Sequence, residues 1–428
     1  MLDSKVWIGG SSRRPRTSPL GGNWGAVVGT GGVLAALMSA GAAAPVATAA
    51  GVHWSIVASP DNEPSAANYL QAASCVSASA CASVGSWVTK HGAAETLVES
   101  WNGKRWSITP SPPAGPSSRY NYLQGVTCTS PRICRAVGDY GNAAISLDGG
   151  TTKTLIESWD GKSWSVLPSP NAGGPVPNGS LAGVSCPSAH DCLAVGNFGS
   201  AGAIKTLIES WDGKSWSVLP SPNEGLSSAD YLWGVSCAGP SACTAVGDWE
   251  VKGGAAGTLV ESWDGSAWSL VTSPNGGASG SYNVLNGISC ASSSACVAVG
   301  RYETSGLVSK TLIEAWDGIA WSVLPSPNEG SFYNTLNGVS CPTASACTAV
   351  GSFFNNGGRS KTLVESWDGR SWSVVASPNV GPAPASGAPS FANGLNAVSC
   401  NVRCTAVGWS VDVRTSVTKA LIESGPRA

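Results

Sequence analysis

Fourteen cysteines occur along the chain as seven close pairs. Five residues separate the two cysteines in six of the pairs, and three residues separate them in the last pair. An even number of cysteines at short, regular spacing is typical of disulfides that staple hairpins in an oxidising compartment. We therefore predict these structural disulfides: Cys75–Cys81, Cys128–Cys134, Cys186–Cys192, Cys237–Cys243, Cys290–Cys296, Cys341–Cys347 and Cys400–Cys404.

Metal binding by these cysteines is the first alternative. Thiolate sites are commonly completed by histidine, and the only histidines are His53, His91 and His190. None of them recurs at a fixed distance from a cysteine pair. We expect no metal and no other cofactor, and a redox-active pair is the alternative that the spacing leaves open.

Carboxylates recur just as regularly, in a motif of the type TLIES. A catalytic carboxylate is needed once or twice, in an environment that shifts its pKa. Seven copies favour a structural ladder of hydrogen bonds, and no residue is assigned a catalytic role. The repeated carboxylates are Glu99, Glu157, Glu209, Glu261, Glu314, Glu365 and Glu423.

Thirteen of the 19 tryptophans also recur at two positions of the repeat. A large aromatic ring can fill the wedge between neighbouring sheets and bury about 150 to 250 Å². We therefore predict that these rings pack between repeats. One set opens a WSVL-type segment: Trp54, Trp106, Trp164, Trp216, Trp268, Trp321 and Trp372. The other set ends the TLIES segment: Trp101, Trp159, Trp211, Trp263, Trp316 and Trp367.

The elements that carry these residues repeat every 51 to 59 residues, measured between first cysteines. Each repeat has four short segments separated by turn signals: LxGVSC, CxAVG, TLIES and WSVLPS. An Asp-Gly pair between the third and fourth segments predicts a hairpin in which glycine takes a positive φ. Four antiparallel strands per repeat of this length predict an all-β fold, a β-propeller with seven blades.

The two ends of the chain complete one another. After the leader the chain opens with a fourth strand at 53–60, and it ends after a third strand at 419–424. We predict that the amino-terminal strand completes the last blade and closes the ring, which leaves no open sheet edge. The expected blades, within one domain at 51–428, are 68–112, 121–170, 180–222, 230–274, 283–327, 334–378 and 393–424 completed by 53–60.

Residues 1–50 have the layout of a secretory signal peptide: a basic stretch, an apolar run and an Ala-x-Ala end. We expect cleavage after Ala49 or Ala50, and a retained membrane anchor is the alternative. Arg13 and Arg14 leave twin-arginine export open beside the general secretory route. In each case we expect the rest of the chain outside the cytoplasmic membrane, either secreted or at the cell surface.

Charge limits the choice of partner. Charged residues make up 12% of the chain, and beyond residue 50 acidic residues outnumber basic ones by five. Nucleic acid and anionic membranes both favour basic surfaces. We therefore expect no nucleic-acid partner and no membrane association after cleavage of the leader. The expected form is a monomer, and its expected partner is an extracellular glycan or protein.

The first and third turns of each blade share one face, here called the disulfide face. The other connections share the opposite face, here called the variable face, because they differ in length and composition. After the CxAVG glycine, one varied residue precedes an aromatic residue in six repeats. Strand alternation sends these two sets to opposite sides, so that one lines the funnel and the other packs between blades. Candidate ligand-binding residues are Trp87, Asp139, Tyr140, Asp248, Trp249, Arg301, Tyr302 and Trp409.

The turn Ser158–Trp164, SWDGKSW, resembles the Asp-box of sialidase-type propellers but is one residue shorter, and its Trp-Asp pair resembles the WD40 repeat. The sialidase resemblance implies a glycoside hydrolase with two carboxylates and an arginine cluster. Asp139, Asp248, Glu250 and Glu303 are the carboxylates available on the variable face. The arginines fall at unrelated repeat positions, and we expect recognition rather than catalysis, with a secreted glycoside hydrolase as the alternative.

The repeat as a whole resembles secreted bacterial proteins, of actinobacterial type, with disulfide-stapled propeller repeats. The shared pattern is "GVSC...C.AVG...TLIESWDG..WS...SPN", and it covers residues 54–424. The resemblance implies a propeller fold and carries no known site. We expect an extracellular, non-catalytic recognition or scaffold module that acts through its variable face.

Overall fold

The structure is a computed structural model, and its compact unit spans Val52–Ala428. Within this unit it describes residues 53–63, 66–115, 118–141, 152–171, 178–200, 203–224, 229–251, 255–277, 280–304, 306, 308–354, 359–381, 391–412 and 417–427. The leader predicted at 1–50 lies outside the described residues. Every regular element in the described ranges is a β-strand. These ranges contain no helix long and apolar enough to cross a membrane.

Each sequence repeat contributes four strands. The first strands are β2 (Ala67–Ser77), β6 (Tyr120–Ser130), β10 (Gly179–Ser185), β14 (Ala229–Gly239), β18 (Asn283–Ser292), β22 (Asn334–Thr343) and β26 (Phe391–Cys400). The second strands are β3 (Ala80–Val88), β7 (Ile133–Gly141), β11 (Cys192–Ser200), β15 (Ala242–Glu250), β19 (Ala295–Glu303), β23 (Ala346–Phe354) and β27 (Cys404–Asp412). The third strands are β4 (Ala94–Trp101), β8 (Thr152–Trp159), β12 (Ala203–Trp211), β16 (Ala256–Trp263), β20 (Ser309–Trp316), β24 (Ser360–Trp367) and β28 (Val417–Gly425). The fourth strands are β1 (Ser55–Val57), β5 (Trp106–Ile108), β9 (Trp164–Leu167), β13 (Trp216–Leu219), β17 (Trp268–Leu270), β21 (Trp321–Leu324) and β25 (Trp372–Val374).

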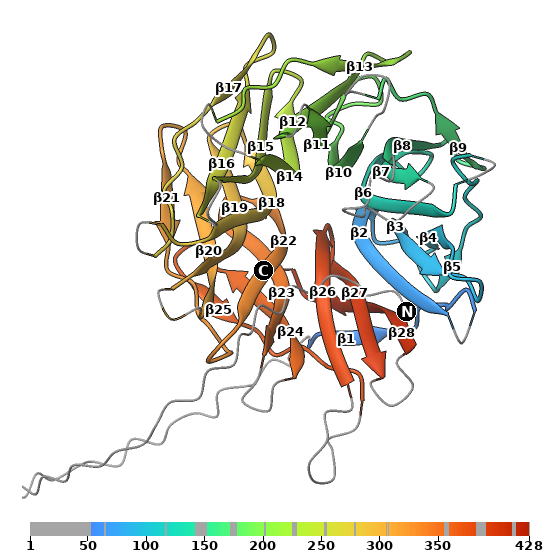
Figure 1. The fold of residues 1–428 in the computed structure, drawn as a ribbon. Helices are drawn as coiled ribbons and strands as arrows, with labels where there is room; N and C mark the ends of the chain where they lie inside the picture. Colours follow the sequence, from blue (N-terminus) through green and yellow to red (C-terminus); the bar gives the residue numbers. More distant parts are fainter. Residues whose placement is uncertain are drawn as a thin grey trace, which may run out of the picture. The chain divides into compact units, whose positions relative to one another are not determined.

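The four strands of a repeat pair antiparallel in chain order. We call each such set a repeat unit and name it by its first strand. In Figure 1 the first strands gather around a common centre and the fourth strands lie at the periphery. The exception to chain order is β1, which pairs with β28 in the register Ser55↔Ser424. The fourth strand of the β26 unit therefore comes from the other end of the described chain.

Two pairs of repeat units are joined more closely than the sequence predicts. The β2 and β6 units form one eight-stranded sheet, and the β10 and β14 units form another. Each join is a single parallel pair, Ala94↔Tyr120 or Ile204↔Ala229. It arises where the start of a third strand meets the start of the next first strand, as when Ala94 N–H donates to the Arg119 carbonyl at 2.9 Å.

The turns of the disulfide face form as predicted. All seven adjacent cysteine pairs are disulfide-bonded, and no described cysteine is free. In the turn between β8 and β9, Gly161 has φ 92°. The Asp160 carboxylate accepts the N–H groups of Lys162 and Ser163, both at 2.8 Å. This turn contacts the disulfide-bonded turn between β6 and β7, because Trp159 Nε1 donates a hydrogen bond to the carbonyl of Pro131.

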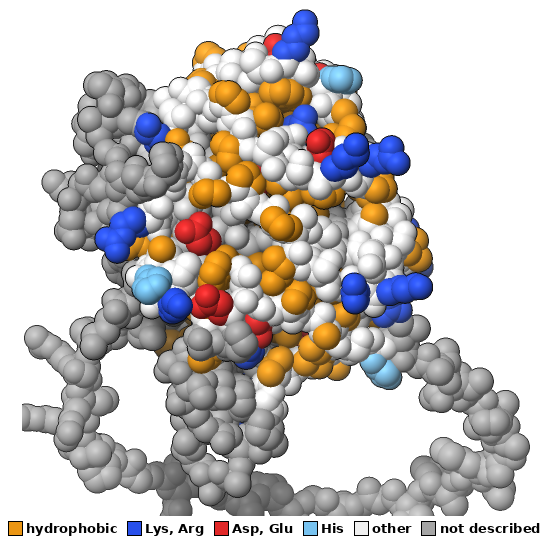
Figure 2. Space-filling model, turned by 90° about the vertical axis from the view of Figure 1, so that its right-hand side faces the viewer, with side chains coloured by type: hydrophobic (Ala, Val, Ile, Leu, Met, Phe, Trp, Pro, Cys, Tyr) orange, Lys and Arg blue, Asp and Glu red, His pale blue; other side chains and the backbone are white. Residues whose placement is uncertain are grey.

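The outer edges of the units are protected by their shortness. The fourth strands are three or four residues long, and a proline soon follows them, as in WSVLPSP. Short edges ending in proline offer little template for pairing with another chain. Along these edges single apolar side chains such as Val166 and Val218 are exposed. On the side shown in Figure 2, charged side chains are scattered, and neither sign gathers into one continuous patch.

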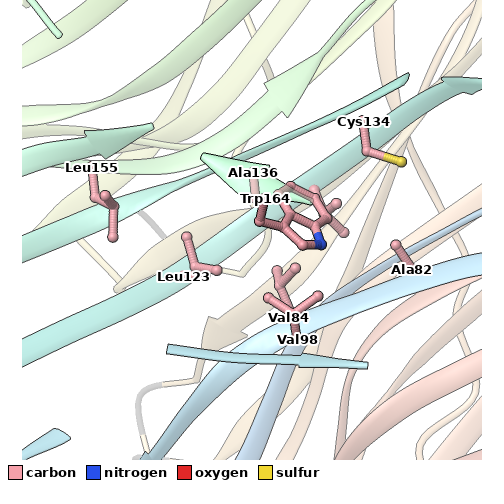
Figure 3. Close-up of a cluster of buried hydrophobic side chains, with 9 residues drawn as sticks. Ala82, Val84, Val98, Leu123, Cys134, Ala136, Leu155 and Trp164 are labelled. Carbon is pink, nitrogen blue, oxygen red and sulfur yellow. The ribbon is translucent and has the colours of Figure 1, made fainter. Parts of the chain in front are cut away.

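Buried hydrophobic clusters lie between consecutive repeat units. In one of them Trp164 of the β6 unit packs against Val84 and Val98 of the β2 unit (Figure 3). In another, Trp106 of the β2 unit packs against Val407 and Ile422 of the β26 unit. The predicted packing of the WSVL tryptophans between repeats is therefore confirmed.

The repeated glutamates also bridge consecutive units. In each bridge a serine that follows a fourth strand donates a hydrogen bond to the glutamate in the third strand of the next unit. Burial raises the pKa of each glutamate to about 7 or about 8, against the opposing effect of the serine. The predicted structural ladder is confirmed by the pairs Ser59–Glu99, Ser111–Glu157, Ser169–Glu209, Ser221–Glu261, Ser273–Glu314, Ser326–Glu365 and Ser377–Glu423.

Candidate ligand-binding face

Each first strand carries a β-bulge one residue after its buried leucine. A bulge adds an unpaired residue and re-aims its side chain. The bulged residues are Gln71, Gln124, Ala182, Trp233, Asn286, Asn337 and Asn396. Several of their amides reach the next unit, as when Asn337 Nδ2 donates to the carbonyl of Leu395 at 2.9 Å.

The residue after the bulge explains why the first strands come so close together. A Cβ atom on Gly287 would lie 2.9 Å from the carbonyl oxygen of Asn337, and one on Gly338 would lie 2.9 Å from the Cα atom of Ala397. Neither distance is compatible with a side chain in an unmoved backbone. Glycine at these positions therefore lets neighbouring first strands approach at their bulges, and the bulged side chains are concentrated around the centre.

The first polar site beside these bulges is built around Asp139 of β7. Its Oδ1 atom accepts hydrogen bonds from Gln124 Nε2 at 2.7 Å and from Ser180 Oγ at 2.8 Å. Burial raises the pKa of Asp139 to about 6, and the two hydrogen bonds oppose that rise. Tyr122 lies opposite Asp139 in the sheet and stacks with Tyr120 at 6.5 Å between ring centroids. Asp139 is therefore hydrogen-bonded both to Gln124 of its own β6 unit and to Ser180 of the neighbouring β10 unit.

The second polar site is built around Asp248 of β15. Trp233 Nε1 donates to Asp248 Oδ1 at 2.6 Å, and its indole stacks on Tyr231 with a 5.4 Å centroid separation and a 9° interplanar angle. Burial raises the pKa of Asp248 to about 7; the Trp233 bond opposes the rise, Glu250 adds to it, and Arg301 opposes it. A buried carboxylate therefore fixes the orientation of a stacked, half-buried aromatic pair.

Arg301 of β19 extends this site across two further units. Its guanidinium carbon lies 5.3 Å from the ring centroid of Tyr282, which precedes β18, and 6.0 Å from that of Tyr333, which precedes β22. Burial and the neighbouring Asp248 raise the pKa of Tyr282 above its ordinary value. We call this set the acidic–aromatic cluster: Tyr231, Trp233, Asp248, Tyr282, Arg301 and Tyr333.

The predicted candidates divide between two environments. Asp248 and Arg301 belong to the acidic–aromatic cluster, whereas Asp139 forms its own site in another pair of units. The second-strand aromatic residues pack against the hydrophobic clusters between units, as strand alternation predicts for one of the two sets. These aromatic residues are Trp87, Tyr140, Trp249 and Tyr302.

Trp409 sits differently from the other aromatic candidates. It pairs with Gly394 of β26, and a Cβ atom on that glycine would lie 3.0 Å from the Trp409 ring. The indole therefore covers the backbone of its own unit. In sequence it follows the glycine one residue earlier than the other aromatic residues do, at the position of Asp139 and Asp248, so strand alternation sends it to the other side of the sheet.

Sequence reasoning did not single out several residues of these two sites. The sequence does not connect Ser180 with Asp139 because the two residues lie in different units, and it does not show that the bulged side chain of Gln124 turns toward Asp139. Tyr282 and Tyr333 lie in the connections before first strands, where the repeat pattern gives no register. One signal was available: the residue after the first-strand leucine varies between Gln, Ala, Trp and Asn, although its neighbours hardly vary.

Among the carboxylates of the variable face, Asp139 lies in a different repeat unit from Asp248 and Glu250 and accepts hydrogen bonds from Gln124 and Ser180. In the acidic–aromatic cluster, Asp248 and Glu250 lie in one strand and act on one another electrostatically. No group of three or more His, Cys, Asp or Glu side chains in the described ranges is arranged to hold a metal ion. What the cluster presents is therefore stacked aromatic surface with fixed polar groups.

Comparisons with known proteins give no family for this chain. No protein-family model and no curated protein sequence matches it. Solved structures that are similar include YCF48 bound to a D1 peptide, at 12% identity and a TM-score of 0.47, covering 87% of this chain and 96% of that one. A SapL1 lectin in complex with alpha methyl fucoside has 16% identity and a TM-score of 0.40, covering 73% and 96%.

A third similar structure is an ulvan lyase, a polysaccharide lyase, at 9% identity and a TM-score of 0.48, covering 80% of this chain and 89% of that one. The β-propeller domain of the Trilobed protease from Pyrococcus furiosus has 10% identity and a TM-score of 0.46, covering 84% and 96%. None of these four scores reaches 0.5, so the fold is argued from this chain's own strand pairing and packing.

Proposed function

We propose that residues 51–428 form a seven-bladed β-propeller whose ring is closed by β1. Three contacts between the first and last repeat units support closure. Trp106 packs against Val407, Asn396 Nδ2 donates to the Leu70 carbonyl at 2.8 Å, and the N–H of Cys75 donates to Ser399 Oγ at 2.9 Å. The same kinds of contact recur between consecutive units elsewhere, so the last interface resembles the others.

The propeller acts outside the cytoplasmic membrane, in this proposal, after export directed by residues 1–50. Seven disulfides within the chain support an oxidising compartment. Each closes a loop so short that the chain-entropy model assigns it only about 2 kcal/mol. Because each disulfide adds little stability, the presence of seven of them is better evidence for an oxidising compartment than for a need for stabilisation.

Its function is non-catalytic recognition of a glycan through the variable face. The observation that carries this proposal is the stacked Tyr231–Trp233 pair held by the buried Asp248. Aromatic rings fixed in place by hydrogen bonds offer a flat apolar surface, and nearby polar groups set the orientation of a ligand. A sugar ring presents an apolar face and a rim of hydroxyl groups, which suits the rings together with Arg301.

A protein ligand is the second candidate, favoured by the position of the cluster. The acidic–aromatic cluster draws side chains from the β14, β18 and β22 units, and Phe332, beside Tyr333, is 58% exposed. Tyrosine, tryptophan and arginine are the residues most enriched at binding hot spots. A peptide crossing three units would contact them together, whereas one sugar ring would contact only part of the set.

The test is a screen of glycans and cell-wall polysaccharides against purified residues 51–428. Tyr231→Ala should weaken binding about tenfold, the effect of losing about 1.4 kcal/mol of stacking and contact. Asp248→Ala should weaken it as well, because Trp233 loses the partner that orients it. Tyr122→Ala is the matched control, since Tyr122 takes the same position in the β6 unit and lies outside the cluster.

Three outcomes separate the possibilities. Saturable glycan binding that Tyr231→Ala weakens and Tyr122→Ala leaves unchanged supports the proposed site. Glycan binding that both variants leave unchanged contradicts the placement of the site in the acidic–aromatic cluster. Release of products from a polysaccharide supports the hydrolase alternative. No glycan binding, together with capture of a defined peptide that Tyr231→Ala abolishes, shifts the ligand class to protein.

A further inference from the structure

A cavity of about 220 Å³ lies on the disulfide face, between the β14 and β18 units. Cys243, Thr244 and Ser262 line it from one unit, and Trp316 and Trp321 line it from the other. No charged side chain of the described residues lines it. It is separate from the acidic–aromatic cluster and takes no part in the function proposed above.

The equivalent groove between the β6 and β10 units is filled by the chain itself. Arg135 Nη1 donates to Ser158 Oγ at 2.8 Å and to the Cys134 carbonyl at 3.2 Å. The guanidinium carbon lies 5.2 Å from the ring centroid of Trp211, in the next unit. The pocket that remains around Cys134 and Arg135 has no room for a water molecule, about 0 Å³.

The two grooves are built from matching positions. Arg135 and Thr244 each follow the second cysteine of a unit, and they pair across the sheet with Ser158 and Ser262. Trp211 and Trp316 each end the third strand of the following unit. The β14–β18 groove therefore has the same serine, backbone carbonyl and indole that surround the Arg135 guanidinium in the β6–β10 groove. In place of the arginine it has Thr244, which carries no guanidinium group.

We propose that the β14–β18 cavity binds a guanidinium group from another molecule. Cys243 O and Ser262 Oγ accept its hydrogen bonds, and the Trp316 ring stacks against its plane. Guanidinium is planar, weakly hydrated and suited to aromatic faces, whereas an ammonium ion is compact and strongly hydrated. The ligand is either an arginine side chain of a peptide or a small guanidino compound, which share this chemistry.

The first measurement is ligand-observed NMR with N-acetylarginine amide and the full mature chain. We expect saturable binding at one site. N-acetylcitrulline amide, the neutral analogue of the same shape, should bind at least about tenfold more weakly because it lacks the charge that the indole attracts. Equal binding of the two compounds, or binding of methyl glycosides and not of arginine, would overturn the proposal.

Two variants should change the number of binding sites in opposite directions. Thr244→Arg supplies the missing guanidinium from within and should abolish binding. Arg135→Thr empties the filled groove and should raise the stoichiometry from one site to two. Thr405→Arg is the control, because it places an arginine at the same repeat position in the β26 unit, where Ser424 already accepts a hydrogen bond from Arg403 Nε at 3.2 Å. It should leave binding unchanged.

These variants keep the proposal testable even where one of them fails to fold. Thermal melting identifies a misfolded Thr244→Arg protein, and the stoichiometry of Arg135→Thr then decides. Binding retained in a folded Thr244→Arg protein contradicts the assignment. An Arg-containing tetrapeptide that binds more tightly than free arginine indicates a protein ligand, and equal affinities indicate a small guanidino compound.

Discussion

The Ser–Glu bridges and the position directly after the CxAVG glycine, here called the inner position, lie in the same sheets. The bridge residues are the same in every unit, whereas the residue at the inner position varies. The bridge uses the same two residue types between every pair of consecutive units. The residue after the CxAVG glycine changes from one unit to the next: Ser86, Asp139, Asn197, Asp248, Arg301, Ser352 and Trp409. The bridge position is therefore constrained by packing, whereas the inner position tolerates many side chains and is available for binding.

Burial alone would not separate these two sets. Glu157 and Asp139 are both almost fully buried, and burial raises the pKa of each, to about 7 and about 6. Strongly shifted carboxylates often mark functional sites, and structural networks shift them too. Repetition is the observation that assigns Glu157 to the scaffold and leaves Asp139 and Asp248 as candidates for function.

The largest effect is expected from removing the strand that completes the β26 unit. A protein that begins at residue 61 lacks β1, loses Trp54 from the cluster it shares with Leu395 and Leu421, and leaves Glu99 without Ser59. The uncovered edge of β28 should pair with other chains and cause aggregation. Size-exclusion chromatography with light scattering measures this; a stable monomer would contradict closure by β1.

A core substitution should come next. Trp164→Ala removes a buried indole between the β2 and β6 units and should cost about 3 to 5 kcal/mol of unfolding free energy, from lost burial and the cavity left behind. Trp249→Ala, at a partly buried ring on another cluster, should cost less. Urea unfolding measures both. A larger loss for Trp249 would place the main packing role on the second-strand aromatics.

The glutamates predict an unusual pH dependence. Their folded pKa values lie near 7 to 8, above the ordinary value of 4.5, so the folded state binds protons more tightly than the unfolded state does. The stability they contribute is full below pH 4.5 and is lost as the pH rises through about 8. The melting temperature should therefore be higher at pH 5 than at pH 8.

A single variant isolates this effect. Glu157→Gln keeps an acceptor for Ser111 but cannot become charged, so it should stabilise the protein by about 1 to 3 kcal/mol at pH 8. At pH 5 it should have little effect, because Glu157 is then protonated. Denaturant unfolding at the two pH values gives the comparison. Destabilisation at pH 8 would mean that the carboxylate is charged and stabilised where it lies.

The sequence predicts the scaffold well because its elements repeat. The stapled hairpins, the Asp-Gly turns, the tryptophans between units and the glutamate ladder each recur at a fixed place, so their roles can be inferred from the pattern. Asp160 and Gly161 form their turn through contacts within three residues. Local rules of this kind need no knowledge of the tertiary structure.

The site is less predictable because it depends on contacts between units. Alternation predicts that Asp139 and Tyr140 point to opposite sides, but not that Ser180 of the next unit reaches Asp139. Tyr282 meets Arg301 through a connection whose course is set by tertiary packing. The parallel joins that create eight-stranded sheets escape prediction for the same reason, since each depends on where one connection passes.

The smallest effect on stability is expected at Asp139. Both of its hydrogen bonds fall on Oδ1, so Asp139→Asn can keep them through the amide oxygen while removing a buried charge. Its folded pKa of about 6 lies above the ordinary value of 3.8, so above pH 6 Asp139 carries a charge that burial makes less favourable than in the unfolded chain. Removing this charge should raise the unfolding free energy by about 1 to 2 kcal/mol at pH 8, less than Glu157→Gln does, because the pKa shift of Asp139 is smaller.

Asp139→Asn also sharpens the comparison between repeated and unrepeated positions. A change of that size, measured by urea unfolding beside Glu157→Gln, agrees with an inner position that packing does not constrain. A loss of several kcal/mol would show that Gln124 and Ser180 need the charged carboxylate. Asp139 would then belong to the scaffold with the glutamates, and the acidic–aromatic cluster would be left as the unrepeated polar site that the scaffold does not require.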